Sequence, residues 1–244
     1  MNKLTYVLSL CLVSLILTHC TPGPSTPEFS DIEAGATRKA AFFNYFLPII
    51  EKQNQQILSN RKQLLHWYKD KNDLGWWDSR NLTDLAENYR ISDFDKSNEN
   101  HWQELLDRIN IVPPSLVLAQ SANESGWGTS RFAIEGNNYF GQWCYVKGCG
   151  LVPGKRLEDQ KHEVSIFDSP EASVESYFYN LNTHQAYKSL RRIRSELNLS
   201  DQQITGVKLV AGLEKYSERG NEYIEEIRSM ISYNGLTKYD SLAQ

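Results

Sequence analysis

Apolar residues recur at intervals of three and four along much of this chain, the spacing of one face of an α-helix. Residues 38–110 carry such a run and are predicted to form an N-terminal helical region, with shorter helices over residues 82–89 and 102–109. The apolar positions of its first helix are Phe42, Phe46, Ile49, Ile50, Ile57, Leu64, Leu65 and Tyr68. Pro48 lies inside this run, and we expect it to bend or interrupt the helix because proline removes a backbone hydrogen bond.

Pro113 and Pro114 mark the start of the second half of the chain. Proline fits the first turn of a helix, so a helix is predicted over residues 115–125. Its residues are small or apolar on nearly all sides, which indicates a buried helix. Gly126 and Gly128 are expected to end it, because glycine adopts the backbone conformation that terminates helices.

Glycine and aromatic residues cluster over residues 137–162, and we expect turns and a small β lobe there. Ser169 followed by Pro170 is typical of a helix start, and apolar residues follow it at helical spacing. Further helices are predicted around residues 201–206 and over residues 223–232. The pattern therefore indicates a mainly α fold with one small β lobe, an α+β arrangement.

The first 20 residues have the features of an export signal. Lys3 precedes an almost wholly apolar stretch that is too short to span a membrane comfortably. The residues that follow resemble a lipoprotein signal in which Cys20 is lipidated, although His19 departs from that pattern; ordinary cleavage nearby or an uncleaved anchor are the alternatives. Prolines and small polar residues over residues 21–37 predict a flexible linker. We expect an exported protein, periplasmic or attached to the membrane by its N-terminus.

Composition and cysteine content narrow the classes of partner and cofactor. The formal net charge of −4 argues against a nucleic-acid partner, which would need a basic face. Outside the export segment the cysteines are Cys144 and Cys149, and a disulfide closing this small loop is the natural interpretation in an oxidising compartment; two unpaired thiols are the alternative. No metal site is expected, because two cysteines do not make a zinc site and His162 has no partner at ligand spacing.

Glu124 is the candidate for acid chemistry, because it stands in the last turn of the buried helix predicted over residues 115–125. Burial disfavours the charged carboxylate and raises its pKa, and the negative end of the helix dipole acts in the same direction. A carboxylic acid that stays protonated near neutral pH is what cleavage of a glycosidic bond requires. The alternative is a glutamate that simply points to solvent at a helix end.

Three segments resemble the bacterial glucosaminidase domains of glycoside hydrolase family 73. Residues 119–130 contain Glu-Ser-Gly-Trp-Gly, as does the family's catalytic helix, and residues 136–141 resemble its second motif with Tyr139 in place of leucine. Residues 213–223 occupy the place of its late tyrosine-containing element, although the two tyrosines are one residue further apart and Arg219 with Gly220 replaces an acidic turn. The resemblance runs from about residue 38 to the end and is closest to the Bax-type branch.

This resemblance implies a lysozyme-like helical body, a small β lobe and a substrate groove between them, with residues 111–244 as the catalytic domain. The implied substrate is the glycan strand of peptidoglycan, cut at the β-1,4 bond after N-acetylglucosamine. Glu124 is then the general acid, and no metal or organic cofactor is implied. The oligomeric state is left open.

The second catalytic group is less defined. The family places another glutamate in the β lobe, and Glu158 and Glu163 are the candidates here. We favour Glu158 as the base or the residue that positions water, although its charged neighbours are equally typical of a solvated loop. The acetamido group of the substrate is the alternative helper, as in some glycosidases.

The remaining candidates are expected to contact or shape the groove. They are Asn138, Phe140, Gln142, Trp143 and Tyr216. Each has an alternative role: Asn138 and its neighbours as turn and packing residues, and Tyr216 as a core tyrosine.

Two other functions stay open at this point. A muramidase or lytic transglycosylase uses the same scaffold and also places one glutamate at a helix end. A non-catalytic wall-binding protein would keep the groove without turnover, and the altered element around Tyr216 leaves room for it.

Overall fold

The computed structural model describes residues 25–154 and 162–243, so the expected export signal, Cys20 and Glu158 lie outside the described residues. The helices are α1 (Ala36–Lys69), α2 (Trp76–Asn88), α3 (Glu99–Arg108), α4 (Pro114–Ser125), α5 (Arg131–Gly136), α6 (Pro170–Thr183), α7 (Lys188–Leu199), α8 (Gly206–Leu209) and α9 (Asn221–Tyr233). The strands are β1 (Trp143–Cys144), β2 (Gly150–Leu151) and β3 (Glu163–Ser165), and 3-10 turns occur at η1 (Phe29–Asp31), η2 (Gln185–Tyr187), η3 (Val210–Gly212) and η4 (Leu236–Ala243). The fold is mainly helical with a small β lobe, as predicted.

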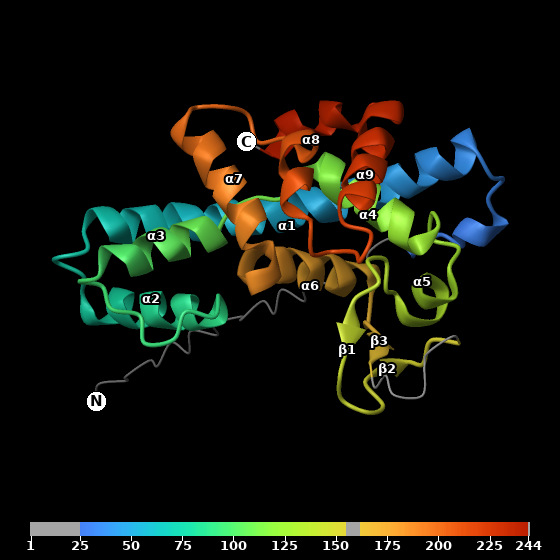
Figure 1. The fold of residues 1–244 in the computed structure, drawn as a ribbon. Helices are drawn as coiled ribbons and strands as arrows, with labels where there is room; N and C mark the ends of the chain where they lie inside the picture. Colours follow the sequence, from blue (N-terminus) through green and yellow to red (C-terminus); the bar gives the residue numbers. More distant parts are fainter. Residues whose placement is uncertain (1–24, 155–161, 244) are drawn as a thin grey trace, which may run out of the picture.

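Helix α4 lies at the centre of the helical body, and α1, α8, α9 and η4 pack around it (Figure 1). Pro114 is its first residue, where the missing N–H has no helical partner to lose. Gly126 ends it in the left-handed conformation, with φ of +56°. Its side chains from Pro114 to Ala122 are all buried, so the predicted buried helix is confirmed.

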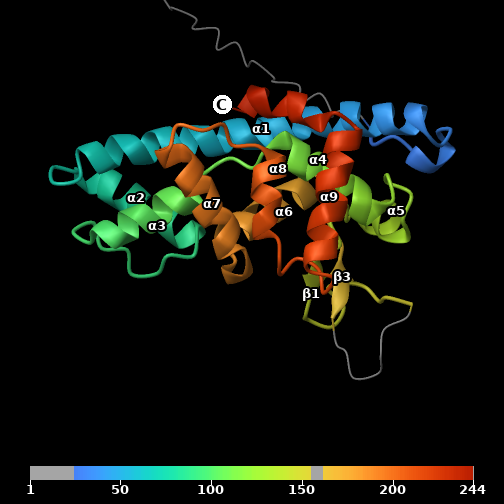
Figure 2. The ribbon, with the colours of Figure 1, turned by 45° about the horizontal axis from the view of Figure 1, so that its top comes forward.

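Helix α1 runs along the whole helical body (Figure 2). We expected Pro48 to bend or interrupt this helix; it does not interrupt it, because the helix continues through this residue to Lys69. A proline inside a helix costs about 3 kcal/mol. Phe46 and Ile50, on either side of Pro48, are fully buried, and burying such side chains contributes roughly 1.5–3 kcal/mol each, which offsets that cost.

The segment before α1 also belongs to the fold. Phe29 in η1 is buried, and its ring lies 5.2 Å from that of Phe42 and 6.3 Å from that of Phe46. A side chain at Gly128 would collide with it, since a Cβ there would lie 2.3 Å from Phe29 Cδ2. The expected flexible linker over residues 21–37 is therefore wrong from Phe29 onward, because an aromatic anchor holds this stretch to the body.

One hydrophobic core joins the N-terminal helical region to the rest of the body. It extends from Phe29 through Trp102 and Leu118 to Leu236. Among the described residues, no helix is both long enough and apolar enough to cross a membrane.

The β lobe projects from the helical body beside α5 and the start of α9 (Figure 1). Its strands form an antiparallel sheet in the order β1, β3, β2, with Trp143 opposite Val164 and Gly150 opposite Ser165. The strands are two or three residues long, so backbone pairing alone holds little of the lobe together.

In the C-terminal half, the helices predicted after Ser169 and over residues 223–232 correspond to α6 and α9. Between these two helices the structure differs from the prediction. The helix expected around residues 201–206 is wrong, because residues 201–205 lie outside any helix. Helix α7, in which Leu190 and Leu197 are buried among arginines, ends before this segment at Leu199, and α8 begins only at Gly206.

Candidate active site

Glu124 lies at the end of α4, where the chain makes a tight turn that its own residues hold. The Ser125 hydroxyl donates to Ser121 O at 2.6 Å and accepts from the Gly128 N–H at 2.9 Å. Trp127 has φ of +62°, an unusual conformation for a bulky residue. Its ring packs 5.4 Å from that of Phe43, so Trp127 supports the turn from within the body.

The Glu124 carboxyl is half-buried and faces the start of α9. The Tyr223 hydroxyl donates to Glu124 Oε1 at 2.8 Å. Burial raises the pKa of Glu124, while hydrogen bonds from Tyr223 and Asn123 act in the opposite direction. Net, the pKa is raised, so the site favours the protonated acid that general-acid catalysis needs.

The late tyrosines stack beside Glu124 and connect it to the β lobe. The rings of Tyr216 and Tyr223 are nearly parallel, 5.4 Å apart. The Tyr216 hydroxyl donates to Phe140 O at 2.8 Å, which joins the segment before α9 to the base of the lobe. Burial raises the pKa of both phenols, so both remain donors at neutral pH.

Gln120, one turn before Glu124 on α4, is a functional candidate that the sequence pattern did not single out. Its Nε2 donates to the Tyr223 oxygen at 2.8 Å, and its Oε1 accepts from the Tyr177 hydroxyl. Its spacing of four from Glu124 places both on one helix face, which was the available signal. Tyr177 and Tyr223 come from distant parts of the chain, and no local pattern predicts that they meet there.

Asn138 and Phe140 have packing roles in the structure. Asn138 is buried; its Nδ2 donates to Gln142 O and Ser165 O, both at 2.9 Å, and its Oδ1 accepts from the N–H of Gln142 at 3.0 Å. Phe140 is buried and stacks on Tyr177, with ring centres 4.1 Å apart. These contacts are those of turn and packing residues, so both shape the site from behind.

Gln142 and Trp143 lie where the lobe meets solvent. Gln142 Nε2 donates to Ser173 O at 3.0 Å and its Oε1 accepts from the Ser176 hydroxyl at 2.8 Å, so this amide ties the lobe to α6. Trp143 is 54% exposed, and one face of its ring stacks on His162 at 3.9 Å. Of the expected groove residues, Trp143 offers the largest exposed surface to a ligand.

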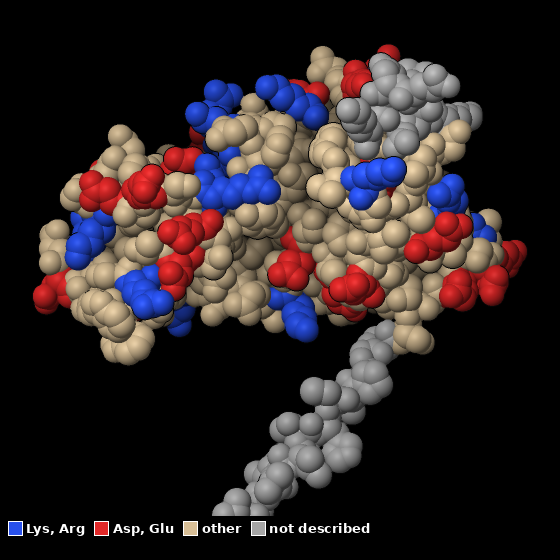
Figure 3. Space-filling model, turned by 90° about the horizontal axis from the view of Figure 1, so that it is seen from below, with Lys and Arg blue, Asp and Glu red and all other residues tan. Residues whose placement is uncertain are grey.

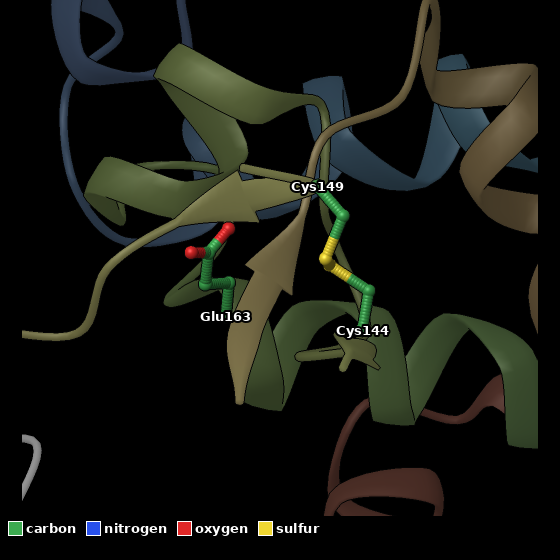
Figure 4. Close-up of side chains that lie close together, drawn as sticks. All are labelled: Cys144, Cys149 and Glu163. Atoms are coloured by element: carbon green, nitrogen blue, oxygen red, sulfur yellow. A yellow bond between two sulfur atoms is a disulfide. The ribbon is translucent and has the colours of Figure 1, made fainter. Parts of the chain in front are cut away.

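Glu163 lies beside the disulfide that joins Cys144 and Cys149 (Figure 4). Its carboxylate accepts from the backbone N–H of Gly148 at 3.1 Å and of Gly150 at 2.9 Å. Three potential metal-binding side chains thus lie together, but the disulfide removes both thiolates that a metal would need. Buried and bonded to the turn, Glu163 holds the lobe in shape.

Charges are mixed on the face shown in Figure 3, where acidic and basic side chains alternate around a hollow. Near Glu124, Arg219 pairs with Glu226 at 2.7 Å. Arg219 lowers the pKa of Glu124 and Glu226 raises it, both less than burial does. Arg219 lies in the turn that departs from the family pattern. The replacement of the acidic turn by Arg219 and Gly220 therefore places the Arg219–Glu226 ion pair near Glu124.

Comparison with known proteins identifies the family of the chain. A family model described as glucosaminidase, mannosyl-glycoprotein endo-beta-N-acetylglucosaminidase, matches residues 99–236. The chain is 35% identical to Protein bax of Escherichia coli (strain K12) over 213 residues, which cover 86% of this chain and 74% of that protein. No solved structure matches the chain significantly. The family model covers more than half of the chain and the relative is similar over most of it, so the chain belongs to the glucosaminidase family of glycoside hydrolases.

Proposed function

We propose that this protein hydrolyses peptidoglycan at the β-1,4 bond after N-acetylglucosamine, with Glu124 as the general acid. The observation that carries the proposal is the half-buried Glu124 carboxyl, whose pKa is raised by burial and whose Oε1 is held by Tyr223. Membership of the glucosaminidase family supports the substrate class.

The acid step requires no cofactor. The proton of Glu124 passes to the glycosidic oxygen as its bond to the anomeric carbon breaks, and the electron pair of that bond stays on the leaving oxygen. Tyr223 then stabilises the carboxylate through its hydrogen bond. The anomeric carbon then forms a bond to the oxygen of a water molecule. Either Glu158 acts as the base that takes the proton of this water, or the substrate's acetamido oxygen bonds to the carbon first and water displaces it. Glu163 is a poorer candidate, because its carboxylate is bonded to the turn.

The lobe offers a surface suited to a glycan. Besides Trp143, it exposes Tyr145 and Val146, and aromatic faces stack on sugar rings. Asn138, Phe140 and Gln142 hold the base of the lobe against the body beside Glu124, and the Tyr216 hydroxyl bonds to this base. A wall substrate agrees with the export signal expected in residues 1–20.

The test is digestion of purified wall sacculi by the full-length protein, with products identified by mass spectrometry. Glu124→Gln should lower the rate at least about a hundredfold, because general acids contribute that much or more. Glu135→Gln, at an exposed glutamate on α5, is the matched control and should keep wild-type activity.

Each outcome of the digestion has a separate meaning. Fragments that end in N-acetylglucosamine support the proposal. Fragments that end in muramic acid, or in its anhydro form, would still agree with Glu124 as the acid. They would show that the enzyme is a muramidase or lytic transglycosylase. Binding to sacculi without any release, by well-folded protein, would instead indicate a wall-binding protein.

A further inference from the structure

Three hydrogen bonds in series lead from the core to the catalytic carboxyl. The Tyr177 hydroxyl donates to Gln120 Oε1, Gln120 Nε2 donates to the Tyr223 oxygen at 2.8 Å, and Tyr223 donates to Glu124 Oε1 at 2.8 Å. Gln120 and Tyr177 are buried, and Tyr177 is also held by its stack on Phe140. The series therefore begins in a rigid part of the body and ends at the reacting group.

An amide gives this series a direction. The oxygen of Gln120 only accepts and its nitrogen only donates. With the oxygen taken by Tyr177, the nitrogen must face Tyr223, so the single Tyr223 hydrogen is directed to Glu124. In the reverse orientation Tyr223 would donate to Gln120, and Glu124 Oε1 would then have to carry a proton to keep a hydrogen bond to Tyr223.

The other carboxyl oxygen, Oε2, lies beside Gly141, which is exposed; a Cβ on this glycine would lie 3.5 Å from Oε2. Gly141 has φ of +63°, a conformation that favours glycine, so this position places no side chain over Oε2. Asn123 also contacts the carboxyl, but an amide can accept as well as donate and is compatible with either state.

We propose that Gln120 and Tyr177 are positioning residues of the active site: through Tyr223 they keep Glu124 Oε1 as a hydrogen-bond acceptor and so place the transferable proton on Oε2. This inference rests on the proposed role of Glu124 as general acid. The proton on Oε2 then faces the side from which a glycosidic oxygen can approach. Without the series, the proton distributes between the two oxygens, and the carboxylate left after transfer loses its donor.

The variants that test this proposal keep the packing and remove the hydrogen bonds. Tyr177→Phe retains the ring that stacks on Phe140, and Gln120→Met retains the side-chain volume. Tyr139→Phe is the matched control, a buried tyrosine whose ring packs on Phe46. All three are made in the full-length protein and compared for thermal stability.

Two measurements separate positioning from structure. Tyr177→Phe frees the Gln120 amide to turn its oxygen to Tyr223, so with soluble glycan strands as substrate it should lower kcat about tenfold with KM within about twofold, and move the alkaline limb of the pH profile to higher pH. Gln120→Met leaves Glu124 as the acceptor of the Tyr223 hydroxyl and should change kcat and the pH profile by less. In 13C NMR of glutamate-labelled protein, the Glu124 signal, assigned by its loss in Glu124→Gln, should titrate at higher pH in Tyr177→Phe. The other groups that influence this titration are the same in all variants: Tyr187, Tyr216, Arg219 and Glu226.

The outcomes distinguish this inference from the proposed function. A shifted titration without turnover of any glycan by the wild type would retain the positioning series and overturn the proposed function. An active Tyr177→Phe variant with unchanged kcat and titration would overturn the inference alone. A loss of kcat that follows thermal stability, with an unmoved titration, would also overturn it, because it would show a purely structural role.

Discussion

The helical body and the β lobe meet at Glu124, but they are held together by different means. In the body, α4 is surrounded by other helices, and its buried side chains belong to one large hydrophobic core. In the lobe the strands are two or three residues long, and Val164, its buried apolar residue, lies outside that core. The lobe depends instead on a disulfide and on the Glu163 carboxylate. The body can therefore fix the acid while the lobe adjusts to a substrate.

The largest expected effect is on the body, at Asp240. This buried carboxylate accepts from Ser115 N–H at 2.9 Å, the Ser115 hydroxyl at 2.7 Å and Gly206 N–H at 3.1 Å, so it joins η4 and α8 to the start of α4. Asp240→Ala should lower the free energy of unfolding by about 3–5 kcal/mol, because it leaves several buried donors without an acceptor. Denaturant titration measures this. Asp240→Asn keeps the volume and one acceptor oxygen and should lose less; equal losses would show that the negative charge or the second acceptor oxygen, which both variants lack, carries the effect.

A smaller effect is expected from the disulfide. Replacing Cys144 and Cys149 together by serine removes a loop constraint worth about 2 kcal/mol for so short a loop. We expect this loss within the lobe, seen as faster hydrogen exchange at the Gly148 and Gly150 amides, with little change in the unfolding of the body. A loss of global stability as large as that of Asp240→Ala would contradict the distinction between body and lobe. It would show that the lobe unfolds in the same cooperative unit as the body.

The same contrast explains what could be predicted from sequence. Helix α4 was predictable because its signals are local: prolines at its start, a glycine at its end and small or apolar residues between. Helix α7 was not, because its apolar face is interrupted by Arg191 and Arg194, which the fold buries by bonding them to backbone carbonyls. Burial of an arginine is a consequence of tertiary packing and leaves no periodic signal.

The site divides in the same way. Glu124 could be proposed from sequence because its motif is contiguous, and the direction of its pKa shift could be predicted from its place on a buried helix. Its partners were not found, because Gln120 meets Tyr177 and Tyr223 only after α4, α6 and α9 have packed. Glu163 was a catalytic candidate because it is a glutamate in the β lobe. Only the structure shows that its carboxylate is bonded to the turn.

A sharper distinction between holding the lobe and acting on substrate comes from Glu163→Gln. The amide can still accept from one backbone N–H, so stability should fall by about 1 kcal/mol and activity only a few-fold. Glu158→Gln is the matched comparison, and as the proposed second carboxylate it should lower the rate at least about a hundredfold. The rate of wall digestion measures both. A hundredfold loss in Glu163→Gln, with the lobe intact by hydrogen exchange, would give Glu163 the catalytic role instead.

The smallest expected effect links the acid to the stability of the body. Burial raises the pKa of Glu124 in the folded state above its value of about 4.3 in an unfolded chain. The folded protein therefore holds this proton more tightly, and stability falls as pH rises from the unfolded pKa through the raised one. Glu124→Gln lacks this term, so its stability relative to wild type should increase over that pH window and then level off, as measured by denaturant titration at several pH values. A difference that stays constant with pH would mean that the folded site does not favour the protonated acid, and the body would then hold Glu124 in place without tuning it.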